Sequence, residues 1–146
     1  MSRWSVWVGR VISALPVGMM VFSSIFKFRP TPEVLQFFTG KFGYPQASLF
    51  PIGVAELFSA ILYAIPQTAV LGAILVTGYL GGAIATHVRA SDPWFGPALL
   101  GGLAWLGLFL RDPRLRELLP LRRLPATEPG RAGAQDLNPA AGTLQR

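Results

Sequence analysis

The sequence predicts an all-α transmembrane four-helix bundle with up-down topology, and three observations lead to this prediction. Hydrophobic residues make up 51% of the 146 residues and charged residues only 14%, whereas a typical soluble domain has about 25% charged residues. The mean hydropathy is +0.45. Long stretches carry no Asp, Glu, Lys or Arg, and the longest of them, Leu57–Val88, has 32 residues. These features argue against a soluble globular protein.

The lengths of the uncharged stretches define four expected membrane spans. A spanning helix needs roughly 20 mostly apolar residues. As one helix, the 32-residue stretch would be about 48 Å long, which exceeds the roughly 30 Å hydrocarbon core, so we expect a turn at Pro66–Gln67. The membrane domain then covers residues 1–111, with spans over residues 6–27, 48–65, 68–88 and 94–111. A cleaved signal peptide is an alternative for the first span, but no A-x-A-like cleavage site follows it.

The connection between the first two spans, residues 30–45, has the features of a short interfacial helix. Thr31 can cap its N-terminus, Pro32 suits its first position, and Gly40 can end it. Its apolar side chains are Val34, Leu35, Phe37 and Phe38. We expect this helix to lie in the membrane interface or to fold over the mouth of the bundle, and an ordinary loop is the alternative.

Residues 112–146 are expected to lie outside the membrane. A short basic juxtamembrane helix is expected near 111–121, followed by a disordered cytoplasmic tail rich in Pro, Gly, Ala and Arg. Arginines at 111, 114, 116, 122 and 123 suit anionic lipid headgroups directly after a span, so we expect the lipid bilayer and no nucleic acid as their partner.

The distribution of basic residues predicts the orientation. Near the span ends, seven cations lie on the side of the two termini and four on the other side. The positive-inside rule therefore puts both termini in the cytoplasm. We expect a multi-pass protein of the cell membrane, specifically of a bacterial inner membrane.

Several kinds of chemistry are excluded by composition. The chain has no Cys and a single His, which excludes disulfides, thiolate nucleophiles, Cys-ligated metals and bis-His haem. It also lacks a Gly-rich phosphate-binding loop. We therefore expect no metal site and no nucleotide cofactor.

Three ionisable residues are expected to converge in one half of the membrane. Lys27 closes the first span, Glu56 lies about eight residues into the second, and His87 closes the third. Up-down topology brings all three to the same half, and an ionisable residue within a span is a candidate functional site. The alternatives are snorkelling of Lys27 to the interface, a structural ion pair at Glu56, and an interfacial polar cap at His87.

Helical spacing adds neighbours to this predicted polar cluster. Ser23 and Ser24 lie one turn before Lys27, and Tyr63 lies seven residues after Glu56, on the same helix face. Such a cluster could hydrogen-bond the head group of a quinone, and its carboxyl and imidazole could carry protons.

A GxxxG motif, Gly78 and Gly82, occurs in the third span. Its spacing places both glycines on the face away from His87. Small residues at this spacing let helices pack closely. Packing within the bundle is one interpretation of the motif, and a homodimer interface is the other.

Four sequence segments resemble the DoxX-like family of small four-helix membrane proteins. They are Phe22-Ser-Ser-Ile-Phe-Lys27, Gly43-Tyr-Pro45, Ile52-Gly-Val-Ala-Glu56-Leu, and Gly81-Gly-Ala-Ile-Ala-Thr-His87. The similarity covers roughly residues 8–111. It implies a four-helix integral membrane bundle in which the family's characteristic Lys, Glu and His correspond to Lys27, Glu56 and His87.

The resemblance also suggests the function. Some relatives are membrane subunits of sulfur-linked quinone oxidoreductases, others accompany oxidative-stress enzymes, and distant ones assist the assembly of membrane proteins. The first hypothesis is therefore an accessory subunit of a quinone-linked redox system that binds a soluble redox partner, without enzymatic activity as an isolated chain. A scaffold or assembly factor is the second hypothesis. A small transporter or channel is the third, and a homo-oligomer could form its pore.

Overall fold

The computed structural model describes residues 3–118, and this part of the chain is helical, with no strand. The all-α prediction is therefore confirmed. The α-helices are α1 (Arg3–Phe28), α2 (Pro32–Gln36), α3 (Leu49–Ala64), α4 (Ala69–Arg89), α5 (Phe95–Arg111) and α6 (Pro113–Leu118). A π-helical turn, η1 (Phe37–Lys41), continues α2, and a 3-10 turn, η2 (Gln46–Ser48), precedes α3.

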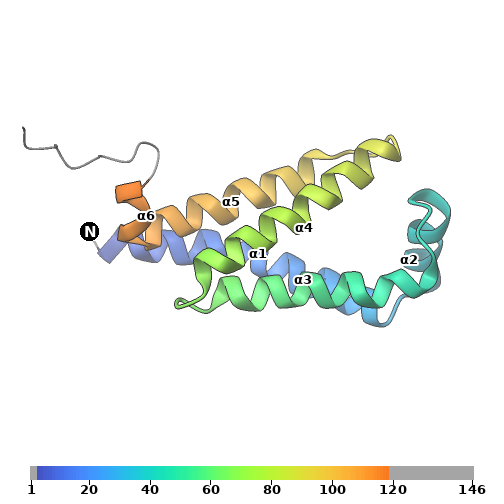
Figure 1. Cartoon of the computed structure of the whole chain (residues 1–146), viewed down its shortest axis with the longest axis horizontal. Coiled ribbons are helices and arrows are strands. Elements are labelled where there is room, and N and C mark those ends of the chain that lie inside the picture. Colours follow the sequence, from blue (N-terminus) through green and yellow to red (C-terminus); the bar gives the residue numbers. More distant parts are fainter. Residues whose placement is uncertain (1–2, 119–146) are drawn as a thin grey trace, which may run out of the picture.

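The four long helices pack side by side in a closed ring of neighbours. Helix α1 packs against α3 and α5, and α4 packs against the same two helices. Consecutive long helices run in opposite directions, and the pair α4 and α5 diverges from the pair α1 and α3 at the end where α2 lies (Figure 1). We call the end that contains the α3–α4 turn the closed end, and the end that contains α2 and the α4–α5 connection the open end.

The helix lengths agree with a membrane location. Three segments are long and apolar enough to cross a membrane: Arg3–Phe28, Gln46–Ala64 and Ala69–Arg89. Helix α5 is apolar but shorter, with 17 residues. The turn expected at Pro66–Gln67 is confirmed, because it separates α3 from α4.

At the closed end, glycines allow helix backbones to touch. A Cβ at Gly9 would lie 2.8 Å from the carbonyl oxygen of Gly107. A Cβ at Gly72 would overlap the backbone of Tyr63. The Tyr63 hydroxyl is buried there, donates to the carbonyl of Ala104 at 2.6 Å and lies 2.9 Å from the Ser13 hydroxyl. This network joins α1, α3 and α5.

The connection after α1 forms the predicted short helix, with one correction. Thr31 caps α2 as predicted, since its hydroxyl accepts a hydrogen bond from the Val34 amide. The helix does not end at Gly40, because η1 carries the chain to Lys41 in π-helical geometry. The chain leaves helical geometry just after η1, at Gly43, where a φ of +71° favours glycine. We call residues 32–44 the covering segment.

Part of the predicted juxtamembrane helix is present as α6. Arg116 donates from this helix to the carbonyls of Phe109 and Leu110, and so satisfies the C-terminal end of α5. The predicted cytoplasmic tail falls on residues 119–146, outside the described residues, and its disorder stays a prediction.

Candidate functional site

The open end contains a cavity of about 500 Å³, which we call the main cavity. Its walls come from α1, α3, α4 and α5, and the covering segment closes part of it. Most of the lining is apolar or aromatic, and the volume is typical of a small-molecule site. The lining includes Met19, Ser23, Lys27, Phe38, Tyr44, Glu56, Gly78, Tyr79, Gly82, Thr86 and His87.

A buried ion pair joins α1 to α3 at the wall of this cavity. The Nζ of Lys27 lies 2.7 Å from Oε2 of Glu56, and the two side chains are only 6% and 4% exposed. Lys27 also donates to the Ser23 hydroxyl at 2.6 Å and lies 5.5 Å from the centre of the Phe38 ring. Each side chain of the pair therefore has a buried polar partner, as a buried ion pair requires.

The close approach of α1 and α3 positions this pair. Gly53 lies one helical turn before Glu56, and a Cβ there would lie 3.0 Å from Cβ of Lys27 and 3.1 Å from the Phe28 ring. A larger residue at Gly53 would separate the two helices. The glycine therefore permits the short Lys27–Glu56 distance.

Two tyrosines add hydroxyl groups to the same cavity. The Tyr79 phenol of α4 interacts with the Glu56 carboxylate across the α3–α4 interface. The Tyr44 hydroxyl lies 2.8 Å from the Thr86 hydroxyl. Since Thr86 donates to the carbonyl of Gly82, which can only accept, Tyr44 is the donor to Thr86. This bond attaches the covering segment to α4.

His87 belongs to a second polar group at the cavity mouth. Its Nδ1 lies 2.7 Å from Oδ2 of Asp92, and Asp92 also pairs with Lys41 of η1. The hydrogen bond from Lys41, and a further one from His87, hold the pKa of Asp92 below its usual range. An ionised Asp92 only accepts hydrogen bonds, so Nδ1 of His87 carries a proton, and Nε2 is the remaining ring nitrogen.

Further contacts hold the covering segment over the mouth. The Phe42 ring packs edge-on against the His87 ring, with the two centres 5.0 Å apart. Arg89 donates to the Phe42 carbonyl at 2.6 Å and lies over the Tyr44 ring. The covering segment is thus attached to α4 and to the α4–α5 connection by side-chain contacts, and within it only Phe42 is buried.

The structure brings together some of the residues singled out in the sequence. Lys27, Glu56, Ser23 and His87 all line the main cavity, and Lys27 contacts both Glu56 and Ser23. The other two candidate residues, Tyr63 and Ser24, do not line this cavity.

Tyr63 lies on the same buried face of α3 as Glu56, but at the closed end. Seven residues of helix separate them by about 10 Å, so the Tyr63 hydroxyl meets Ser13 and Ala104 instead. The Ser24 hydroxyl donates to the carbonyl of Val21 in its own helix, and this residue does not line the cavity.

Gly78 and Gly82 do not have the packing environment expected from the GxxxG motif. A Cβ at either position would meet no atom of the described residues within 4 Å, so none of the described helices packs closely on them. They border the same cavity as His87, although helical spacing places them on a different face of α4. The homodimer interpretation stays a prediction. Close packing occurs at Gly9, Gly72 and Gly107 instead.

Sequence reasoning missed Tyr79, Tyr44, Thr86 and Asp92. A signal existed for Tyr79: Pro66 follows Glu56 by ten residues and precedes Tyr79 by thirteen, so the α3–α4 hairpin brings the two to similar depth. Asp92 had no such signal, because its role depends on Lys41, which lies in a different connection. Within residues 3–118, no group of three His, Asp or Glu side chains could hold a metal ion.

The comparison with known families agrees with this geometry. The family model described as the DoxX-like family matches residues 11–110. No curated protein and no solved structure gives a significant match. The chain belongs to the DoxX-like family, and the matched region contains most of α1, all of α3 and α4, α5 up to Leu110, and every residue that lines the main cavity.

Proposed function

We propose that this protein is an accessory subunit of a quinone-linked membrane redox system and that the main cavity binds the quinone or a similar apolar ligand. The observation that carries the proposal is an apolar cavity of about 500 Å³ that ends on the buried Lys27–Glu56 pair. A quinone head group is planar and apolar, with carbonyl oxygens that only accept hydrogen bonds. The residues present fit such a group.

The proposal includes a four-span topology. At about 1.5 Å per residue, the 17 residues of α5 extend about 26 Å, at the lower limit for a spanning helix. Exposed Trp4 and Trp7 on α1 and exposed Trp94 before α5 suit the two membrane interfaces. Both termini would then face the cytoplasm of a bacterium, where a soluble redox partner could bind.

Each polar residue of the cavity has a role in this proposal. Two of the three Lys27 N–H groups go to Glu56 and Ser23, so the third is the hydrogen-bond donor for a ligand carbonyl. The single hydrogen of the Tyr79 hydroxyl is directed to Glu56, so Tyr79 helps to hold that carboxylate. His87, oriented by Asp92, can exchange a proton at Nε2 near the mouth. A bound quinone would supply the two-electron chemistry, and its electrons would come from the partner enzyme.

The surface around the cavity suits entry from the bilayer. Met19, Gly78 and Gly82 line the cavity and are exposed on the surface of the apolar helices. A ligand dissolved in the hydrocarbon would reach the cavity there without crossing water. This route agrees with a lipid-soluble ligand.

The test is quinone content and affinity in Glu56→Gln. The full chain, purified in mild detergent, is extracted with organic solvent and analysed by mass spectrometry, and a ubiquinone or menaquinone analogue is then titrated into it. We expect about one quinone per chain in the wild type and at least about tenfold weaker binding in Glu56→Gln. Ser24→Ala is the matched control, because Ser24 is buried on α1 but lies outside the cavity.

A scaffold or assembly role is the second candidate, and the Lys27–Glu56 pair itself favours it. The pair joins α1 to α3 and so stabilises the fold without any ligand. If quinone is absent and Glu56→Gln lowers only the thermal stability, the scaffold role replaces the redox proposal. A transporter or channel has no comparable support from the cavity, because the covering segment closes one side.

A further inference from the structure

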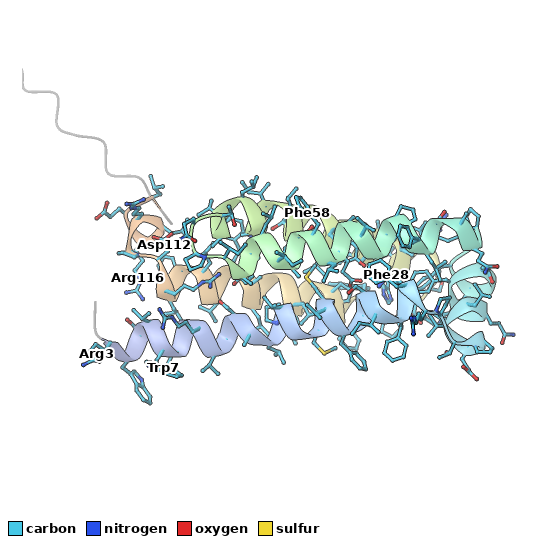
Figure 2. The ribbon with its side chains drawn as sticks, turned by 90° about the horizontal axis from the view of Figure 1, so that it is seen from below. Arg3, Trp7, Phe28, Phe58, Asp112 and Arg116 are labelled. Carbon is cyan, nitrogen blue, oxygen red and sulfur yellow. The ribbon has the colours of Figure 1, made fainter. Side chains whose placement is uncertain are left out.

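A second pocket of about 280 Å³, which we call the basic pocket, lies at the closed end of the helices. It is lined by Arg10 of α1, by Arg111 at the end of α5, by Arg114 of α6 and by Asp112 between those helices. Val6 and Leu108 are part of its apolar wall. Figure 2 shows Arg3, Trp7, Asp112 and Arg116 at this end, whereas Phe28 lies toward the other end.

The basic pocket has an excess of positive charge that the described residues do not neutralise. Three guanidinium groups and one carboxylate line it. Within residues 3–118, Arg10, Arg111 and Arg114 form no ion pair. The Asp112 carboxylate instead accepts a hydrogen bond from the Arg114 amide and so begins α6.

Arg111 is held rigidly in the wall of the pocket. Its Nη2 donates to the Tyr63 carbonyl at 2.8 Å, and its guanidinium lies 4.7 Å from the centre of the Tyr63 ring. Tyr63 is itself buried and hydrogen-bonded to Ala104. The Nε of Arg111 is buried and has no hydrogen-bond partner among the described residues. A guanidinium fixed in this way loses little conformational entropy when it binds an anion.

We infer that the basic pocket binds a phosphate group, supplied by the headgroup of an anionic phospholipid. Guanidinium groups bind phosphate oxygens through paired, charge-assisted hydrogen bonds. The pocket lies where apolar helices end, which is the depth of lipid phosphates when those helices cross a bilayer. Its wall of Val6 and Leu108 suits the glycerol and the first methylenes of a lipid. A soluble phosphate has the same anion chemistry but no use for this apolar wall.

This inference requires the membrane location but not the quinone proposal. The basic pocket and the main cavity share no lining residue. The basic pocket lies beside the network of Tyr63, at the other end of α3 from the covering segment. If the pocket bound no lipid, the redox proposal would therefore be unaffected. If the main cavity bound no quinone, the lipid inference would be unaffected in turn.

The experiment measures lipid affinity in a charge-matched pair of variants. The full chain in dodecyl maltoside is titrated with phosphatidylglycerol, with phosphatidylcholine and with inorganic phosphate, and binding is followed by thermal stability and by native mass spectrometry. Arg10→Gln/Arg114→Gln removes two cations from the pocket. Arg3→Gln/Arg29→Gln removes two cations outside it and is the control. Arg111 is left in place because it also supports Tyr63.

We expect the wild type to bind phosphatidylglycerol in preference to phosphatidylcholine. The pocket variant should lose at least about tenfold in affinity for phosphatidylglycerol, whereas the control should change less than about twofold. If inorganic phosphate binds as tightly as the lipid and with the same dependence on Arg10 and Arg114, a soluble phosphate is the source of the anion. Equal losses in the two variants, or no binding of either anion, would overturn the site.

Discussion

Glycines near the α3–α4 turn and glycines that border the main cavity have opposite environments. At the closed end, Gly9, Gly72 and Gly107 stand where another backbone or side chain occupies the place of a Cβ. At the open end, Gly53 lets α1 approach α3, whereas a Cβ at Gly78 or Gly82 would meet no atom of residues 3–118 within 4 Å, and these two glycines border the main cavity. The comparison indicates that the closed end supplies stability, while the open end keeps the space that a ligand needs.

The largest effect should come from adding a methyl group at the closed end. In Gly72→Ala the new Cβ overlaps the backbone of Tyr63, so the α3–α4 turn must move, at a cost of about 3 kcal/mol or more. Thermal unfolding in detergent should show this loss. The matched variant Gly78→Ala should retain or slightly raise stability, by up to about 1 kcal/mol from helix propensity. Equal destabilisation by the two variants would contradict the division into two ends.

A slightly smaller effect is expected from the ion pair of the open end. Glu56→Leu leaves the Lys27 ammonium buried without its partner, which should cost about 3 kcal/mol. The double variant Lys27→Met/Glu56→Leu should recover most of this stability, since no buried charge is left, but it should not bind quinone. A double variant as unstable as the single one would show that the cost lies in packing rather than in charge.

An intermediate effect is expected from Tyr63→Phe. This change removes the hydroxyl that donates to the Ala104 carbonyl and leaves that carbonyl without its side-chain donor, at a cost of about 1 to 2 kcal/mol. Chemical or thermal unfolding measures the loss. Quinone affinity should stay within about twofold of wild type, because Tyr63 lies outside the main cavity. A strong loss of quinone binding would contradict this prediction and would show that the closed end also affects the ligand site.

The smallest effect should be confined to the covering segment and should depend on pH. Lys41 and His87 lower the pKa of Asp92 in the folded protein, so the contribution of Asp92 to stability is present above its ordinary pKa and is lost as the pH falls through the lowered value. After correction for intrinsic exchange rates, hydrogen exchange of residues 37–44 should therefore be constant between about pH 7 and 5 and should rise below about pH 4.

Asp92→Asn is the control for this pH dependence. It removes the carboxylate at every pH, so exchange of residues 37–44 should be faster than in the wild type at neutral pH and nearly independent of pH after correction for intrinsic exchange rates. Exchange in α3 should not respond to the substitution. A pH response in Asp92→Asn equal to that of the wild type would assign the effect to another group.

The positions of the long helices could be predicted closely from the sequence. The expected segments 6–27, 48–65, 68–88 and 94–111 differ from α1, α3, α4 and α5 by at most three residues at either end. The reason is that hydropathy, proline and helix caps act over a few neighbouring residues. The convergence of Lys27 and Glu56 could also be predicted, because helices of known length and alternating direction fix the depth of each residue.

Other features of the site depended on which helix face meets which neighbour. Helical spacing placed Tyr63 with Glu56 correctly on one face, but the distance along the axis separates them. The GxxxG motif resembles a packing motif, yet the divergence of α4 from α1 leaves Gly78 and Gly82 against the main cavity. A one-dimensional pattern does not contain this divergence.

The set of helices, their alternating direction and the shared depth of Lys27 and Glu56 thus follow from the sequence alone. The pairing of Lys27 with Glu56, the link that Asp92 makes between His87 and Lys41, and the pocket lined by arginines of α1, α5 and α6 depend on how the helices pack. The difference lies in the range over which each property acts. Apolar length and helix caps are local properties, whereas ion pairs and cavities arise where segments that are distant in the chain are brought together by packing.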